Sequence, residues 1–295
     1  MFRLNEVVVA SRGISLSSDL IEELCQRGIR LTFLTGRGTP YAMITSPMLT
    51  ATIMARRQQL LAFSDQRGLT FSLLVVEGKI KNQEKLLKYF AKYLKKVDPD
   101  RFQRIQGIVQ GLSGVRKKVK EVTGQNIDDG RERLMGLEGV AGRLYWDGVK
   151  GIITQKVEFF GREHRGATDA VNSLLNYGYG ILYSQVSGAI VNAGLEPYAG
   201  FLHTDRSGKP SLVMDMIEEF RQPVVDRVVI AHINLGEVVK MTEEGKLAAD
   251  TKHYFASKVL ERLGSTEMVR GKKYQIRSII QMQARNLSAF LTGRR

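Results

Sequence analysis

The chain has 295 residues, 43% hydrophobic and 25% charged, as in an ordinary globular protein with a sizeable core. Its net charge of +14 favours a polyanionic partner such as nucleic acid, although charge does not determine a fold. The single cysteine excludes an internal disulfide and suggests a reducing cytoplasm. No apolar run reaches the roughly 18 residues that span a bilayer, so we expect no membrane partner.

Residues 1–47 are expected to form a small β-rich domain. Between its first two strands, Ser17 predicts the start of a helix with one apolar face, and Gly28 is typical of its end. Strands are predicted, from β-branched runs and alternation, at residues 7–9, 29–34 and 41–45.

Residues 48–295 are expected to form a larger all-α domain, because prolines become sparse and apolar residues recur at helical spacing. Helices are predicted at about 49–63, 71–96, 100–121, 126–146, 168–193, 211–238, 248–263 and 274–291. The fold class is therefore α+β, with a small β-rich N-terminal domain followed by a large helical domain that would carry the chemistry.

Basic residues are concentrated in two segments. Residues 76–121 carry thirteen Lys/Arg and five Asp/Glu, and the last 26 residues carry seven Lys/Arg and no acid. On the predicted helix 71–96, lysines recur at three- and four-residue spacing opposite an apolar stripe. Such a strip suits the DNA backbone, and we take Lys81, Lys85 and Lys88 as candidate DNA contacts. The alternative is a solvated helix face.

The four histidines differ in their surroundings. His232 lies in an apolar helical stretch and is expected in the core, whereas His253 lies beside polar neighbours and is expected at the surface. His164, in the basic run 162–165, could contact phosphate or simply be exposed. His203 is a candidate site residue, since it follows an apolar helix and a turn and precedes a loop and another helix.

Asp215 and Glu218 form a second candidate, because they lie three residues apart on one helix face in apolar surroundings. Buried carboxylates are costly unless they are paired or bind a cation. The sequence therefore leaves open a metal site or ion pairs with Arg221 and Arg227. Glu138, flanked by small and apolar residues, is by itself a weaker signal.

Four ordered stretches between residues 135 and 227 carry a family resemblance. They read LEGVAGRLYW, RGATDAVNSLLNYGYGIL, GLEPYAGFLH and SLVMDMIEEFRQPVVDR. The chain resembles the CRISPR-associated integrase, the larger of the two universal adaptation proteins that insert new spacers. Segments near both ends of the chain resemble the family's N-terminal β-domain and its last helix.

The resemblance implies three metal ligands, Glu138, His203 and Glu218, with Asp215 as a further acidic residue of the catalytic site. Two carboxylates and an imidazole suit Mg²⁺ or Mn²⁺ with positions left for water and phosphate. It also implies that the polar residues Asn172 and Arg221 line the site, where they would contact DNA.

Two departures from the family accompany these implications. Further strands usually precede the stretch that matches Val7 in the family; here either the sequence starts late or this member has a shortened β-domain. The family's basic motif is replaced by residues 162–166, in which Arg165 is the candidate DNA contact.

The implied function is metal-dependent attack of a DNA 3′-hydroxyl on a CRISPR repeat, with endonuclease activity when water is the nucleophile. The implied partners are double-stranded and branched DNA, a second copy of the chain in a homodimer, and a small ferredoxin-like adaptation protein. The alternatives are a non-catalytic basic DNA-binding structural protein and a plain metal-dependent nuclease.

Overall fold

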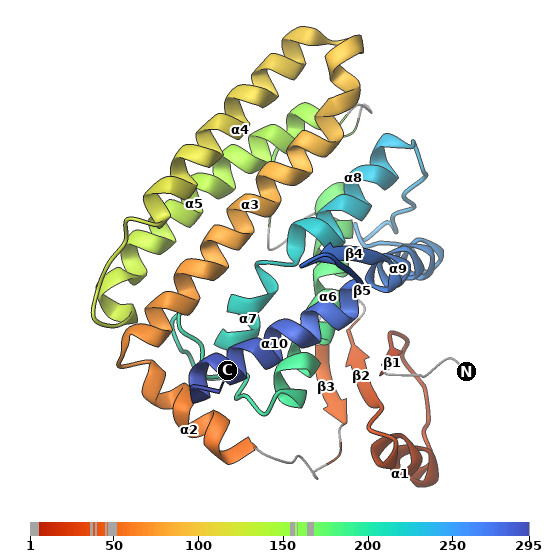
Figure 1. Cartoon of the computed structure of the whole chain (residues 1–295). Coiled ribbons are helices and arrows are strands. Elements are labelled where there is room, and N and C mark those ends of the chain that lie inside the picture. The colour runs from red at the N-terminus through yellow and green to blue at the C-terminus, as the bar shows by residue number, and fades with distance from the viewer. Residues whose placement is uncertain are drawn as a thin grey trace.

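The computed structural model describes residues 6–35, 38, 40–44, 46, 52–153, 157, 159–163 and 168–294. A small N-terminal sheet lies against a much larger helical body, which confirms the predicted fold class (Figure 1). The predicted domain boundary at residues 47/48 and the candidate residues His164 and Arg165 lie outside the described residues.

The N-terminal unit is a three-stranded sheet with one helix, as predicted. Its elements are β1 (Glu6–Val9), α1 (Ser18–Gln26), β2 (Arg30–Leu34) and β3 (Pro40–Ile44). β1 runs parallel to β2, with Val7 opposite Leu31, and β3 runs antiparallel to β2, as the predicted hairpin requires. The Ser17 side chain caps α1 by accepting from the Leu20 backbone N–H, and Gly28 has a φ of +67° at the other end.

The helical body is a single apolar core enclosed by the remaining elements. These are α2 (Thr52–Ala62), α3 (Gln66–Val97), α4 (Pro99–Val119), α5 (Ile127–Ile152), α6 (Ala170–Asn192), α7 (Ser211–Ile217), the π-helix η1 (Arg221–Asp226), α8 (Arg227–Asn234), α9 (Ala249–Gly264), β4 (Thr266–Val269), β5 (Lys272–Gln275) and α10 (Ile276–Thr292). Within the described ranges, no helix is both long and apolar enough to cross a membrane.

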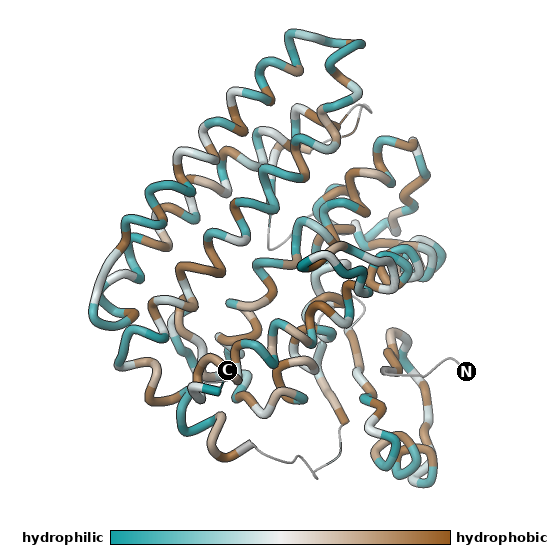
Figure 2. The backbone as a smooth tube through the Cα atoms, viewed as in Figure 1, coloured by the Kyte–Doolittle hydropathy of each residue, from teal (hydrophilic) through white to brown (hydrophobic). Residues whose placement is uncertain are grey.

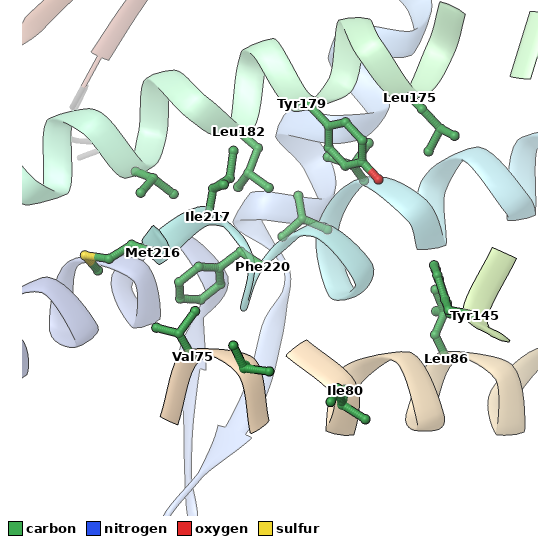
Figure 3. Packing of buried hydrophobic residues seen from close by; sticks show 14 of the residues in the cluster. Val75, Ile80, Leu86, Tyr145, Leu175, Tyr179, Leu182, Met216, Ile217 and Phe220 are labelled. Atoms are coloured by element: carbon green, nitrogen blue, oxygen red, sulfur yellow. The ribbon is translucent and has the colours of Figure 1, made fainter. Parts of the chain in front are cut away.

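The long helices α3, α4 and α5 lie side by side and extend beyond the rest of the molecule (Figure 1). Hydrophobic and hydrophilic residues alternate along them, as expected of helices with one buried face (Figure 2). α6 is different, because nearly its whole circumference is buried. In Figure 3, Phe220 lies between Val75 of α3 and Leu182 of α6, so α3 and α6 enclose the segment that follows α7.

Two features differ from the sequence-based prediction. The single helix predicted at 211–238 is divided into α7, η1 and α8, and Pro223 lies in the π-helical turn. The segment between the last two predicted helices forms the hairpin β4–β5, so the large domain is not all-α. Arg270 and Gly271 both have positive φ, as a two-residue hairpin turn of this kind requires.

Candidate active site

A cavity of about 640 Å³ in the helical body brings together the three predicted metal ligands. Glu138 enters it from α5, His203 from the loop after α6, and Glu218 from the end of α7. The other polar residues that line it include Lys79, Gln83, Arg143, Tyr145, Arg162, Tyr179 and Arg221. Segments about 80 residues apart in the chain therefore converge on one site, which spacing alone could not establish.

Asp215 holds the loop that carries His203. Its fully buried carboxylate accepts backbone N–H groups from Phe201 (2.7 Å), Leu202 (3.0 Å) and His203 (2.9 Å). The same carboxylate lies 2.7 Å from the His203 ring Nδ1. Since a carboxylate accepts hydrogen bonds, Nδ1 is the ring nitrogen that donates, and in the neutral ring Nε2 is then the nitrogen with the free lone pair. Asp215 is thus a positioning residue whose oxygens are already used.

Gly200 allows this loop to lie directly against α7. An added Cβ there would lie 2.6 Å from the Ser211 carbonyl carbon and 2.8 Å from the Leu212 nitrogen. Real side chains do not tolerate such contacts with backbone atoms, so only glycine fits. The close approach is what brings the loop amides within reach of Asp215.

Glu218 is a buried carboxylate between two cations. Its Oε1 accepts from Arg221 Nε (3.0 Å), and its Oε2 lies 2.5 Å from the Lys79 ammonium. Burial alone would raise the pKa of Glu218, but Arg221 and Lys79 outweigh it and lower that pKa to about 2. Glu218 is therefore ionised throughout the neutral range.

Lys79 of α3 was not among the predicted site residues. Its ammonium bridges Glu218 and Glu138, with a direct hydrogen bond to Glu138 Oε1. Burial lowers the pKa of Lys79, but the two carboxylates outweigh that effect and raise it. A sequence signal existed: Lys79 falls on the apolar face of the helix with Val75 and Val76, where a lysine needs a partner.

The sequence leaves two alternatives for Asp215 and Glu218, a metal site or ion pairs with Arg221 and Arg227, and the structure contains one of these ion pairs. Arg221 does pair with Glu218, but Arg227 lies over the Tyr89 ring at 4.3 Å and does not reach either acid. Among the described residues, no three His, Cys, Asp or Glu side chains converge closely enough to hold a metal ion, because the Lys79 ammonium lies between the two glutamates.

The donor set nevertheless fits a hard divalent cation. Two carboxylates and an imidazole with a free Nε2 face one cavity, and the buried Glu218 Oε2 makes no hydrogen bond of good geometry although Lys79 is close. The ammonium also shows that the surrounding charge stabilises a cation at this position. The fit requires Lys79 to move aside.

Asn172, a candidate DNA contact, is not among the residues that line the cavity. It is 1% exposed, and its side chain accepts from Arg162 Nη1 (3.1 Å) and the Glu163 backbone N–H (2.9 Å), while donating to the Gly161 carbonyl (2.8 Å). Its role in the structure is to fix the segment that carries Arg162. The sequence does not indicate that residues 161–163 pack beside Asn172, so this role could not be predicted from it.

Arg162 and Arg221 instead supply positive charge inside the cavity. Their guanidinium groups lie 5.3 Å and 4.5 Å from the centroid of the Tyr179 ring. Burial is the main cause that lowers the pKa of Arg162. Arg221, as predicted, lines the cavity, and both groups suit an anionic phosphodiester.

The three predicted DNA-contact lysines lie elsewhere. Lys81, Lys85 and Lys88 are exposed on α3, and none of them lines the active-site cavity. Lys81 and Lys85 line a separate cavity between α3, η1, β4 and α10.

A family profile described as "CRISPR associated protein Cas1" matches residues 1–263 of the chain. The CRISPR-associated endonuclease Cas1 1 of Archaeoglobus fulgidus is 35% identical over 303 residues, covering 99% of this chain and 87% of that protein.

Solved structures show the same fold. A casposase bound to integration product superposes with a TM-score of 0.83 at 22% identity, covering 99% of this chain and 79% of that chain. A Cas6-RT-Cas1–Cas2 complex gives a TM-score of 0.74 at 22% identity, covering 98% of this chain and 31% of that chain.

Proposed function

The chain belongs to the family of CRISPR-associated Cas1 proteins, and from this premise we propose that it is a metal-dependent DNA endonuclease and integrase of CRISPR adaptation. In the integration reaction, a donor DNA 3′-hydroxyl oxygen forms a bond to a phosphorus atom of the repeat. The existing P–O3′ bond breaks and leaves a new 3′-hydroxyl end. With water as the nucleophile, the same site hydrolyses the phosphodiester.

In this proposal Glu138, His203 and Glu218 hold Mg²⁺ or Mn²⁺. When bound, the cation would act as a Lewis acid that polarises a phosphodiester oxygen. Asp215 fixes the His203 ring so that Nε2 is the nitrogen available for coordination. Arg162 and Arg221 bind the non-bridging oxygens and stabilise negative charge that develops on the phosphate.

The observation that supports this function best is the convergence of two carboxylates, an imidazole and two arginines on one cavity. Acids and bases so arranged suit a site that must bind a metal ion and an anionic backbone together.

The test is a strand-transfer assay with a repeat-containing plasmid, short duplex donors and Mn²⁺. We expect Glu138→Gln, His203→Ala and Glu218→Gln to abolish strand transfer while leaving DNA binding largely intact. Full strand transfer by His203→Ala would remove the basis of the site assignment.

Matched controls are available on the exposed surface. Glu132 is exposed on the same helix as Glu138, and His253 is exposed on α9. Glu132→Gln and His253→Ala should retain wild-type strand transfer, which separates loss of the site from loss of any acid or histidine.

The ion pairs of Lys79 favour a second candidate, a non-catalytic DNA-binding protein in which Glu138 and Glu218 serve only structure. Mn²⁺-dependent nicking of a branched DNA would exclude this candidate. Nicking without strand transfer would instead favour a plain nuclease.

The partners are also part of the proposal. We expect a homodimer that assembles with a small ferredoxin-like adaptation protein, supported by the family membership and by the structural similarity to a complex that contains Cas1 and Cas2. The measurement is light scattering of the purified chain with and without that partner. A reducing cytoplasm is supported by the single cysteine.

A further inference from the structure

A second cavity, of about 610 Å³, borders α3 on a face different from the one that carries Lys79. Lys79 faces the active-site cavity, whereas Lys81, two residues later, lines the second one. Two residues correspond to about 200° around a helix, so Lys79 and Lys81 point to opposite sides of α3, and the two cavities use different faces of this helix. Arg227 and the strand β4 contribute to the far wall of the second cavity, and Figure 1 shows α8 and β4 beside α3.

The cations of this cavity are largely free of acidic partners. Lys81 and Lys85 are exposed, and in the described part of the chain neither forms an ion pair. Arg227 lies over the Tyr89 ring and makes no ion pair with a described acid. Of the two acids that line the cavity, Glu267 is held by Arg262 at 2.6 Å. The cavity therefore presents net positive charge to solvent.

The same face of α3 continues past the cavity as a ridge. Residues at four-residue steps, which lie in one row on a helix, are Lys81, Lys85, Tyr89, Tyr93 and Val97. The two tyrosines are 48% and 58% exposed. A parallel row consists of Lys88, Lys92, Lys95 and Lys96, and residues 85–97 contain no acid.

Exposed aromatic rings among unpaired lysines are suited to unpaired bases on a phosphate backbone. Tyr89 and Tyr93 are separated by about 6 Å along the helix axis, at 1.5 Å per residue. Successive bases of B-DNA are only about 3.4 Å apart, so a stacked duplex cannot place neighbouring bases on both rings. An extended single strand can.

We propose that this ridge and the second cavity bind single-stranded DNA, with Lys81 and Lys85 on its phosphates and Tyr89 and Tyr93 stacked against its bases. The inference rests on the proposed function only in taking DNA as the substrate. It assigns a strand-holding surface separate from the site of phosphodiester chemistry.

The test measures fluorescence anisotropy of the full-length protein with a labelled oligothymidine and with a duplex of equal length. Replacing both rings, in Tyr89→Leu/Tyr93→Leu, should weaken single-strand binding by at least about 25-fold, since each of the two stacked bases contributes about fivefold or more. Duplex binding should stay within about twofold, given that phosphate contacts do not depend on the rings.

Two comparisons make this result specific. Tyr89→Phe/Tyr93→Phe keeps both rings and should bind the single strand like wild type, which shows that the rings rather than the hydroxyl groups are needed; retained duplex binding shows that the leucine variant is folded. Tyr41→Leu/Tyr198→Leu removes two equally exposed tyrosines elsewhere and should have no effect.

The lysines give an independent readout. Lys81→Gln/Lys85→Gln should reduce the slope of log affinity against log salt by about 1.4 for the single strand, because each lost phosphate contact accounts for about 0.7. Unchanged single-strand affinity in the leucine variant, or equal losses for single strand and duplex, would overturn the proposal. If the single-strand affinity of the leucine variant is unchanged, the ridge and the second cavity would instead suit an acidic protein surface.

Failure here can be distinguished from failure of the proposed function. Glu138→Gln should lose strand transfer and keep single-strand binding. A wild-type protein that shows the tyrosine effect without strand transfer would contradict only the proposed function.

Discussion

At the scale of single residues, the cavity of the candidate active site contains its own cation. Lys79 holds Glu138 and Glu218 together in a nearly buried position where two bare carboxylates would repel each other. The same two carboxylates are the proposed ligands of a divalent metal. Lys79 and the metal should therefore compete for them.

We predict that Lys79→Met lowers the unfolding free energy by about 3–5 kcal/mol without divalent metal, as expected when one partner of a buried ion pair is removed. Millimolar Mn²⁺ should then stabilise the variant more than it stabilises wild type. The measurement is urea unfolding with and without Mn²⁺. Lys81→Met, an exposed lysine on the other side of α3, is the control, and equal Mn²⁺ increments in all three proteins would refute the competition.

We also predict that Asp215→Asn weakens Mn²⁺ binding and strand transfer by about 10- to 100-fold, the usual effect of losing an outer carboxylate partner of a ligand histidine. The amide cannot accept on both sides, so the His203 tautomer is no longer fixed. Nitrogen NMR of the His203 ring should show the change directly. Asp205→Asn, at an exposed position in the following loop, should leave the spectrum unaltered.

The sequence points to residues whose proposed role depends on their own chemistry, and it misses residues whose position depends on packing. Glu138, His203 and Glu218 do share one cavity. Lys79 lies in a lysine-rich segment and is easily overlooked there, although its position on the apolar face of α3 distinguishes it from the other lysines. Asn172 looked like a polar site residue, but its hydrogen bonds are all internal.

At the scale of elements, one buried acid joins three of them. Asp226 of η1 is fully buried and accepts from Tyr145 of α5 (2.6 Å) and Tyr179 of α6 (2.5 Å). Burial raises the pKa of Asp226, and the two tyrosine hydroxyls, which favour the charged form, reduce that rise without cancelling it. The folded state therefore binds a proton at Asp226 more readily than the unfolded chain does.

We predict that Tyr145→Phe destabilises the protein by about 1–3 kcal/mol at neutral pH, the cost of leaving a buried acceptor short of a donor. Because the raised folded-state pKa makes ionised Asp226 a stability cost above that pKa, the deficit should shrink as the pH falls and Asp226 takes up a proton. Urea unfolding at neutral and acidic pH measures both effects. Tyr198→Phe, on the surface, should be neutral, and a deficit independent of pH would show that Asp226 is not responsible.

The sequence predicts helices where local signals are strong, but it does not predict the irregularities of those helices. α3 begins at Gln66 rather than near residue 71, because Asp65 caps it by accepting from the Arg67 backbone N–H. The hairpin β4–β5 has an Arg-Gly turn instead of the usual Asn-Gly, so its signal was weak. The π-helix is set by tertiary packing of η1 against α6 and α3, which no window of sequence reports.

At the scale of the whole molecule, the N-terminal sheet is seated on the helical body through a glycine. An added Cβ at Gly180 of α6 would lie 1.6 Å from the Gly38 carbonyl oxygen and 2.4 Å from the Gly38 carbonyl carbon, so the backbone would have to shift. Leu34 of β2 also joins the core of the helical body. The N-terminal unit therefore packs closely on the helical body. The hydrophobic pattern within each unit does not reveal this packing.

We predict that Gly180→Ala costs about 1–3 kcal/mol or more, as overpacking of a tight contact does, and that it exposes the N-terminal unit to limited proteolysis before the helices unfold. Gly136→Ala, on α5 with open space around it, should be neutral or slightly stabilising, since alanine is the better helix former. Identical proteolysis of the two variants would mean that the sheet is held by other contacts.

The π-helical turn between Glu218 and Arg227 also affects how this chain is compared with others. The Arg227 N–H bonds to the carbonyl of Gln222, five residues back, so this turn holds one residue more than an α-helical turn. A relative with a regular helix here needs one residue fewer between its matching glutamate and aspartate. An alignment without a gap at this turn would misplace either Glu218 or Asp226, and a genome survey that fixes their spacing would overlook true members.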